Sequence, residues 1–156
     1  NNFTGSIPTS IGSLVHLLYL RLDNNRFSRK LPSSLINCKE LVTIDIAKND
    51  FVGSIPSWIG HRLSSLVILN LHSNNFHGEI PAKVTRLKGL QSLNLSFNIL
   101  TGRIPEKIGD LGSVESIDFS SNQLSSQIPQ SMSSLTFLSQ LNLSNTNLIG
   151  KIPSNT

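Results

Sequence analysis

The chain has 156 residues, enough for one domain, with 13 basic and 9 acidic side chains and a formal net charge of +4. Charged residues make up 14%, well below the roughly 25% of an average soluble protein, and the basic ones are scattered, which argues against a nucleic-acid-binding face. The single cysteine, Cys38, excludes an intrachain disulfide, and it excludes a zinc or iron–sulfur site built from cysteines.

One phrase, L-x-x-L-x-L-x-x-N-x-(L/F)-x-G-x-(I/L)-P, recurs through the chain. Its Asn recurs every 24 residues, with one step of 25 between Asn49 and Asn74 and a last position taken by Thr146. The prolines all occupy one place in the phrase: Pro8, Pro32, Pro56, Pro81, Pro105, Pro129 and Pro153. Self-similarity at this period predicts a solenoid of stacked coils.

The first element expected in each coil is a short strand, because apolar residues alternate with polar ones. The inward pairs are Leu20/Leu22, Ile44/Ile46, Leu69/Leu71, Leu93/Leu95, Ile117/Phe119 and Leu141/Leu143. Stacking the coils sets these strands side by side. We therefore expect a parallel sheet of about six strands.

A turn at the recurring Asn follows each strand. Because an Asn amide both donates and accepts hydrogen bonds, a stacked column of these amides is expected to satisfy the backbone of the turns. Two residues later comes an apolar position, predicted to be core in all seven cases: Phe3, Phe27, Phe51, Phe76, Leu100, Leu124 and Leu148. The four phenylalanines should stack on one another.

Glycine comes next in most coils, where the backbone conformation or a close approach should exclude a side chain, although Arg29 and Ser126 break this rule. Proline then favours an extended backbone before it. A short helical turn on the outer face, such as 11–14, closes each coil. The apolar side chains buried by one coil alone cannot offset the conformational entropy lost on ordering it, so neighbouring coils must stack for the chain to fold.

The phrase L-x-G-x-I-P resembles the plant-specific class of extracellular leucine-rich repeats, over essentially all of the chain. The resemblance implies an α/β fold, a right-handed solenoid with a concave parallel β-sheet and short 3-10 or helical turns on the convex side. We expect residues 1–156 to form a single solenoid of about six repeats. Both ends should be uncapped, because the paired cysteines of the family's caps are missing.

Two stretches look like plant receptor-like proteins of innate immunity. Residues 55–60, Ile-Pro-Ser-Trp-Ile-Gly, with the 25-residue step resemble the repeat before the family's island domain, and residues 90–156 resemble the last repeats before the membrane. Here Pro81 runs straight on to Leu87 and Leu90, so either this member lacks the island or the island has been removed. No signal peptide opens the chain and no apolar stretch reaches the roughly 20 residues of a membrane span, so we expect a piece of a longer protein.

The resemblance implies a protein-binding module outside the cell, in a receptor held at the plasma membrane. It would sense an extracellular protein or peptide in defence and recruit a co-receptor kinase ectodomain near the C-terminal repeats. A constitutive adaptor kinase acting near the membrane is also implied. A secreted inhibitor of a microbial cell-wall-degrading enzyme, like the polygalacturonase inhibitors, is a second possibility. A stress protein that adsorbs ice is a third, although a mixed strand face argues against it.

The concave face is the usual binding surface of a solenoid. In the first three coils its outward residues are chemically mixed: Tyr19, Arg21, Asp23, Thr43, Asp45, Ala47, Ile68, Asn70 and His72. In the last three they are small and polar: Ser92, Asn94, Ser96, Ser116, Asp118, Ser120, Gln140, Asn142 and Ser144. Because interfaces favour Tyr and Arg, we predict ligand contacts at the first set apart from Ala47, against the alternative that these are ordinary solvated residues.

Three N-x-S/T acceptor sequences predict N-glycosylation at Asn2, Asn94 and Asn142. No arrangement of residues favours catalysis, a cofactor or a metal, because His72 and His77 lack further ligands and Asp45 and Asp118 lie three coils apart. Two outer-face residues are expected to pack rather than react, namely Cys38 as a small hydrophobe and Trp58 between the outer turns.

Overall fold

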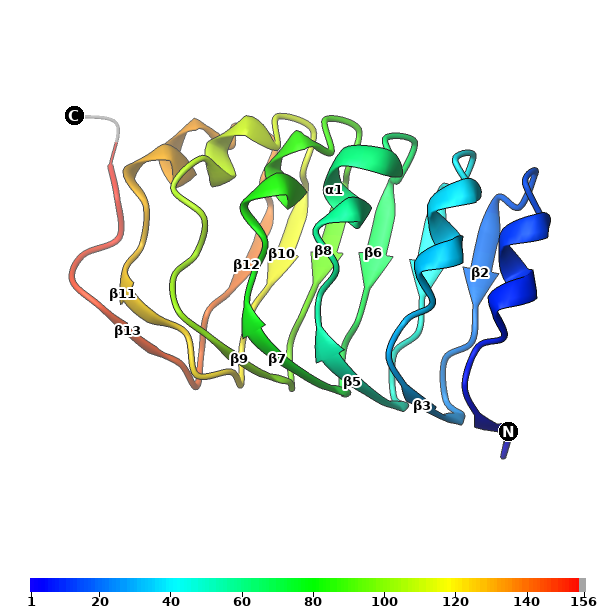
Figure 1. Cartoon of the computed structure of the whole chain (residues 1–156). Coiled ribbons are helices and arrows are strands. Elements are labelled where there is room, and N and C mark those ends of the chain that lie inside the picture. Colours follow the sequence, from blue (N-terminus) through cyan, green and yellow to red (C-terminus); the bar gives the residue numbers. More distant parts are fainter. Residues whose placement is uncertain (155–156) are drawn as a thin grey trace.

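The computed structural model describes residues 1–154, and the last two residues of the 90–156 stretch lie outside them. Its main sheet has six parallel strands in the order β12-β10-β8-β6-β4-β2 (Figure 1). These strands are β2 (Tyr19–Arg21), β4 (Thr43–Asp45), β6 (Ile68–Asn70), β8 (Ser92–Asn94), β10 (Ser116–Asp118) and β12 (Gln140–Asn142). The expected solenoid with a parallel sheet is confirmed.

A second set of parallel strands follows the Asn turns, and the sequence pattern did not predict it. One sheet has the order β1-β3-β5-β7-β9, and β11 pairs with β13. Their bounds are β1 (Thr4–Gly5), β3 (Arg26–Arg29), β5 (Asp50–Ser54), β7 (Asn75–Glu79), β9 (Ile99–Thr101), β11 (Ser125–Gln127) and β13 (Asn147–Ile149). The coils therefore have strands on two sides (Figure 1).

Short helical turns close the coils on the side away from the main sheet (Figure 1). They are η1 (Thr9–Ser13), η2 (Ser33–Asn37), α1 (Trp58–Arg62), η3 (Ala82–Arg86), η4 (Ile108–Asp110) and η5 (Gln130–Ser134). Five of them are 3-10 turns, as expected. Trp58 is half-buried against the core, so the expectation that it packs on this side is confirmed.

The Asn column is present and uses both ends of each amide. In the central coils, Nδ2 of Asn98 donates to the carbonyl oxygens of Leu71, Leu95 and Ser96 at 3.0, 3.1 and 3.2 Å. Its Oδ1 accepts from the backbone N–H of Phe76 at 3.0 Å. Each Asn thereby ties its own turn to the preceding coil, which fixes the stacking register.

The four phenylalanines stack with ring centroids 6.2 to 6.4 Å apart. Phe51 and Phe76 are fully buried, but Phe3 is 62% exposed, so the prediction that Phe3 lies in the core is wrong. Leu141 likewise is exposed, although it was expected to face inward. Both lie in terminal coils, where the described chain supplies a neighbour on one side only.

The glycine position has a left-handed backbone, and both exceptions to the pattern keep this conformation. Arg29 and Ser126 have φ of 66° and 71°, close to the 75–92° of the five glycines at this position. Left-handed conformation favours glycine because a Cβ is penalised there. Glycine at the helical turns has another role, since a Cβ on Gly60 would collide with the backbone carbonyl of Lys83.

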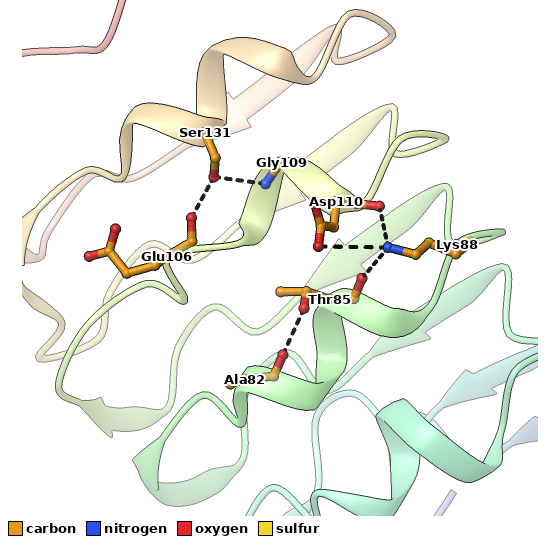
Figure 2. Close-up of polar contacts among 7 residues, drawn as sticks. All are labelled: Ala82, Thr85, Lys88, Glu106, Gly109, Asp110 and Ser131. Carbon is orange, nitrogen blue, oxygen red and sulfur yellow. Dashed lines mark hydrogen bonds and ion pairs between the residues drawn. The ribbon is translucent and has the colours of Figure 1, made fainter.

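Polar contacts join neighbouring helical turns (Figure 2). The ammonium of Lys88 donates to the carbonyl oxygens of Thr85 and Asp110 at 3.3 and 3.1 Å and lies 3.8 Å from the Asp110 carboxylate. The hydroxyl of Ser131 donates to the carbonyl of Glu106 and accepts from the N–H of Gly109. These contacts provide hydrogen-bond partners for backbone carbonyl and N–H groups that the short turns leave unpaired.

Candidate functional site

The outward side chains of the six-stranded sheet form a continuous surface, here called the strand face. Tyr19 and Arg21 lie at its N-terminal end on β2 and are both exposed. They are two residues apart on one strand, so they share a face. The Arg21 guanidinium lies 5.8 Å from the centroid of the Tyr19 ring, a cation–π contact. The pair presents an aromatic ring and a fixed positive charge together.

Thr43 differs from the expectation for this face. It is only 4% exposed, because it lies in register between the larger Tyr19 and Ile68. The smaller residues Ala47, Ser96 and Ser120 are buried too, contrary to their expected exposure. Thr43 therefore offers a ligand almost no surface.

The last residue of a main-sheet strand, such as Asp45 or Asn70, uses its side chain to hold the backbone that follows. Oδ1 of Asp45 accepts from the N–H of Ala47 at 3.1 Å, and Oδ1 of Asn70 accepts from the N–H of His72 at 3.1 Å. The same bond recurs at Asn94, Asp118 and Asn142. Side-chain bonds to the N–H two residues on form Asx turns, which end each strand. Only the second polar atom of each side chain is left to face a ligand.

Asp23 lies just beyond β2, where its Oδ2 accepts from Nδ2 of Asn24 at 2.9 Å. Ile68 is half-buried on β6, so it presents part of an apolar side chain between Thr43 and Ser92. Together with Tyr19 and Arg21, these residues lie at the N-terminal half of the strand face.

His72 is held in a defined orientation at the end of β6. Its Nδ1 lies 2.7 Å from the hydroxyl of Ser96 and its Nε2 lies 3.1 Å from the hydroxyl of Ser73. The Ser96 hydroxyl already donates its one proton to Oδ1 of Asn94, so it accepts a hydrogen bond from Nδ1 of His72. The ring also meets Phe97 edge to face, with centroids 5.4 Å apart and planes at 89°.

Phe97 is a candidate contact that the sequence pattern missed. It is 55% exposed and has a φ of 54°. The equivalent position in the other coils is held by Asn24, Lys48, Ser73, Ser121 and Asn145, all polar and all left-handed. A bulky residue is rarely found in this conformation. The sequence signal that could have identified Phe97 was an aromatic residue at a repeat position that is otherwise polar.

The three glycosylation candidates differ in surroundings. Asn2 and Asn142 are exposed, whereas Asn94 is half-buried. Asn94 and Asn142 line one shallow hollow over β8, β10 and β12. Modification at Asn2 stays a prediction.

Possible metal ligands are not gathered together within residues 1–154. No group of three or more His, Cys, Asp or Glu side chains there could hold a metal ion. Cys38 is fully buried, its thiol donates to the carbonyl of Ile11 at 3.4 Å, and burial raises the pKa of the thiol above its usual value. None of the helices within that range has the length and apolar character needed to cross a bilayer.

Family models and curated sequences give consistent matches. Models described as leucine-rich repeat match residues 88–148, and residues 16–38 and 65–87. Receptor-like protein 53 of Arabidopsis thaliana is 41% identical over 68 residues, which is 44% of this chain and 7% of the relative. Receptor-like protein EIX1 of Solanum lycopersicum is 42% identical over 77 residues, 49% of this chain and 7% of the relative. The chain thus spans a small part of these relatives.

Solved structures match over nearly the whole chain. The ectodomain of the receptor kinase GASSHO1/SCHENGEN3 from Arabidopsis thaliana, in complex with CASPARIAN STRIP INTEGRITY FACTOR 2, has a TM-score of 0.91 and 38% identity. That match covers 95% of this chain and 18% of that one. The Arabidopsis receptor kinase HAESA, in complex with the peptide hormone IDA and the co-receptor SERK1, has a TM-score of 0.93 and 34% identity, covering 98% and 26%. The resemblance to plant receptor ectodomains is confirmed.

Proposed function

Since the chain belongs to the leucine-rich-repeat family, we propose that it is a protein-binding part of a plant cell-surface receptor, exposed outside the cell. Its strand face binds an extracellular protein or peptide, and the receptor then recruits a co-receptor kinase in defence signalling. We take residues 1–156 as one solenoid unit of about six repeats. The module binds and does not catalyse.

The observation that carries the proposal is the unequal chemistry of the strand face. Tyr19 and Arg21 present a stacked ring and cation at one end. His72 and Phe97 present a second aromatic pair nearer the middle. Aromatic residues and Arg dominate the energy of protein interfaces, because they bury large areas at low entropic cost.

Between these two pairs lie smaller contributions from Asp23, Asp45, Ile68 and Asn70. Asp45 is in register with Arg21, so positive and negative groups adjoin on this face. A ligand with both an apolar side chain and charged groups of each sign fits this surface. The surface of an ice crystal does not fit the strand face, because ice offers neither charged groups nor apolar side chains.

The solved relatives support the class of partner. HAESA was crystallised with a peptide hormone and a co-receptor, and the structure of the plant peptide hormone receptor RGFR1 is in complex with RGF2. We propose that this chain also contacts both kinds of partner, with the ligand on the N-terminal half of the strand face. The co-receptor kinase ectodomain would contact the C-terminal repeats.

A binding titration with the secreted chain tests the proposal. The co-receptor ectodomain and purified extracellular proteins and peptides from infected tissue would be titrated separately. Replacing Tyr19 and Arg21 together by Ala should weaken ligand binding by about 2 kcal/mol or more, roughly 30-fold. The control is Lys39→Ala, an exposed charge next to a helical turn.

The outcomes separate the candidate functions. Loss of ligand binding in the double variant, with the control unchanged, supports the proposal. Binding and inhibition of a microbial cell-wall-degrading enzyme without any co-receptor binding would favour the inhibitor instead. Equal binding by the double variant and the wild-type chain would overturn the assignment of this face.

A further inference from the structure

We propose that Asn94 and Asn142 each carry an N-linked oligosaccharide, so that glycans cover the C-terminal half of the strand face. This inference rests on the proposed extracellular location. It adds a modification site and a consequence for the ligand, which must then contact the half of the face that holds Tyr19 and His72.

The two side chains are arranged alike. Oδ1 of Asn94 accepts from the N–H and the hydroxyl of Ser96 at 3.0 and 2.6 Å. Oδ1 of Asn142 accepts from the same groups of Ser144 at 3.1 and 2.7 Å. Within residues 1–154, neither Nδ2 has a hydrogen-bond partner. Nδ2 is the atom to which the sugar is joined, so the folded chain leaves it free for a substituent.

Other Asn residues show what the fold would not tolerate. Nδ2 of Asn98 is fully engaged by three carbonyls in the buried column, and a sugar there would break all three bonds. Asn70 ends its strand with the same Oδ1 bond as Asn94, but His72 stands where the acceptor sequence needs a hydroxyl. Asn70 is therefore a matched residue that lacks only the acceptor sequence.

The surrounding surface has room for the sugars. Asn94 and Asn142 line the same shallow hollow, whose other lining includes the short side chains of Ser92 and Ser116. They are two strands apart, or about 10 Å at roughly 4.8 Å per strand. Two glycans rooted at this spacing would screen the hollow and the strands beneath it. A partner of the last repeats would then approach from the second sheet or the helical turns.

The chemistry needs one co-reactant, a lipid-linked oligosaccharide diphosphate presented by a transferase. Nδ2 attacks the anomeric carbon, a C–N bond forms, and the C–O bond to the diphosphate breaks. The lipid diphosphate leaves, and the nitrogen loses one proton. No electrons are transferred to or from the protein.

Intact-mass measurement tests the proposal. The full chain would be secreted from plant cells with an added leader and a tag that has its own acceptor sequence, and each variant would be weighed before and after enzymatic deglycosylation. Asn94→Gln and Asn142→Gln should each lose the mass of one glycan, and the double variant should lose two. Asn70→Gln is the control and should lose none.

Ser96→Ala and Ser144→Ala provide a second route, because they remove the acceptor sequence and keep the asparagine. They should give the same losses, and circular dichroism would verify that each variant is folded. If the tag carries its glycan but replacing Asn94 or Asn142 does not change the mass of the chain, the assignment at that residue is overturned. Because the leader delivers the chain to the transferase, this outcome is independent of whether the natural receptor binds a ligand.

Discussion

The side-chain Nδ2 of Asn98 donates to the carbonyl oxygen of Leu71 in the preceding coil, 3.0 Å away. We expect Asn98→Ala to lower the free energy of unfolding by on the order of 3 kcal/mol, because buried carbonyls lose their donor. Asn75→Ala is the control, since Asn75 is exposed, and should change it by less than about 0.5 kcal/mol. Urea titration would measure both, and equal midpoints for the two variants would contradict a stabilising Asn column.

Gly60 lets α1 approach the following turn. A Cβ there would overlap the carbonyl of Lys83, which is backbone and cannot swing away. We expect Gly60→Ala to destabilise the chain by about 1–3 kcal/mol, the usual cost of overpacking. Gly112→Ala should be neutral or slightly stabilising, because a Cβ at Gly112 meets no atom within 4 Å. Thermal melts of the pair would reveal the difference, and a wild-type melting temperature for Gly60→Ala would show that the turns can separate.

Phe97 combines an unfavourable backbone conformation with a favourable contact to His72. Relief of left-handed strain is worth about 1–2 kcal/mol, and loss of the edge-to-face contact costs about 0.5–1.5 kcal/mol. We expect Phe97→Gly to leave stability within about 1 kcal/mol of wild type while weakening ligand binding by about 2 kcal/mol. Calorimetry of unfolding and of binding would measure the two quantities. A stability loss without a binding loss would make Phe97 a structural residue.

Cys38 should be unreactive in the folded chain. Its thiol is buried and its pKa is raised by that burial, so little thiolate forms. Burial places the folded-state pKa of this thiol above its unfolded-state pKa, so unfolding releases a proton from Cys38 at alkaline pH. The free energy of unfolding is therefore unaffected below the unfolded-state pKa, and it falls as the pH rises from there through the folded-state pKa. A disulfide exchange reagent should label Cys38 only in denaturant, and Cys38→Ala should remove this alkaline component. Rapid labelling in buffer would indicate that η2 opens.

Much of the fold could be predicted because each coil repeats the same local requirements. The 24-residue recurrence of Asn, Pro and Gly indicated the stacking, the main sheet and the Asn column. The recurrent glycine indicated a position with a special backbone, but only the structure showed that Arg29 and Ser126 keep its left-handed conformation. Of the candidate site, the exposed Tyr19 and Arg21 followed from alternation along one strand.

The amino-acid sequence by itself determined the solenoid, its main parallel sheet and its resemblance to the leucine-rich-repeat family, because these depend on periodicity. Only the tertiary structure decided how much of each side chain is left to contact a ligand. Thr43 is buried by its in-register neighbours, and His72 meets Phe97 from the next coil. Exposure and side-chain pairing depend on the sizes and positions of residues in adjacent coils, and a repeated pattern within one coil does not specify these.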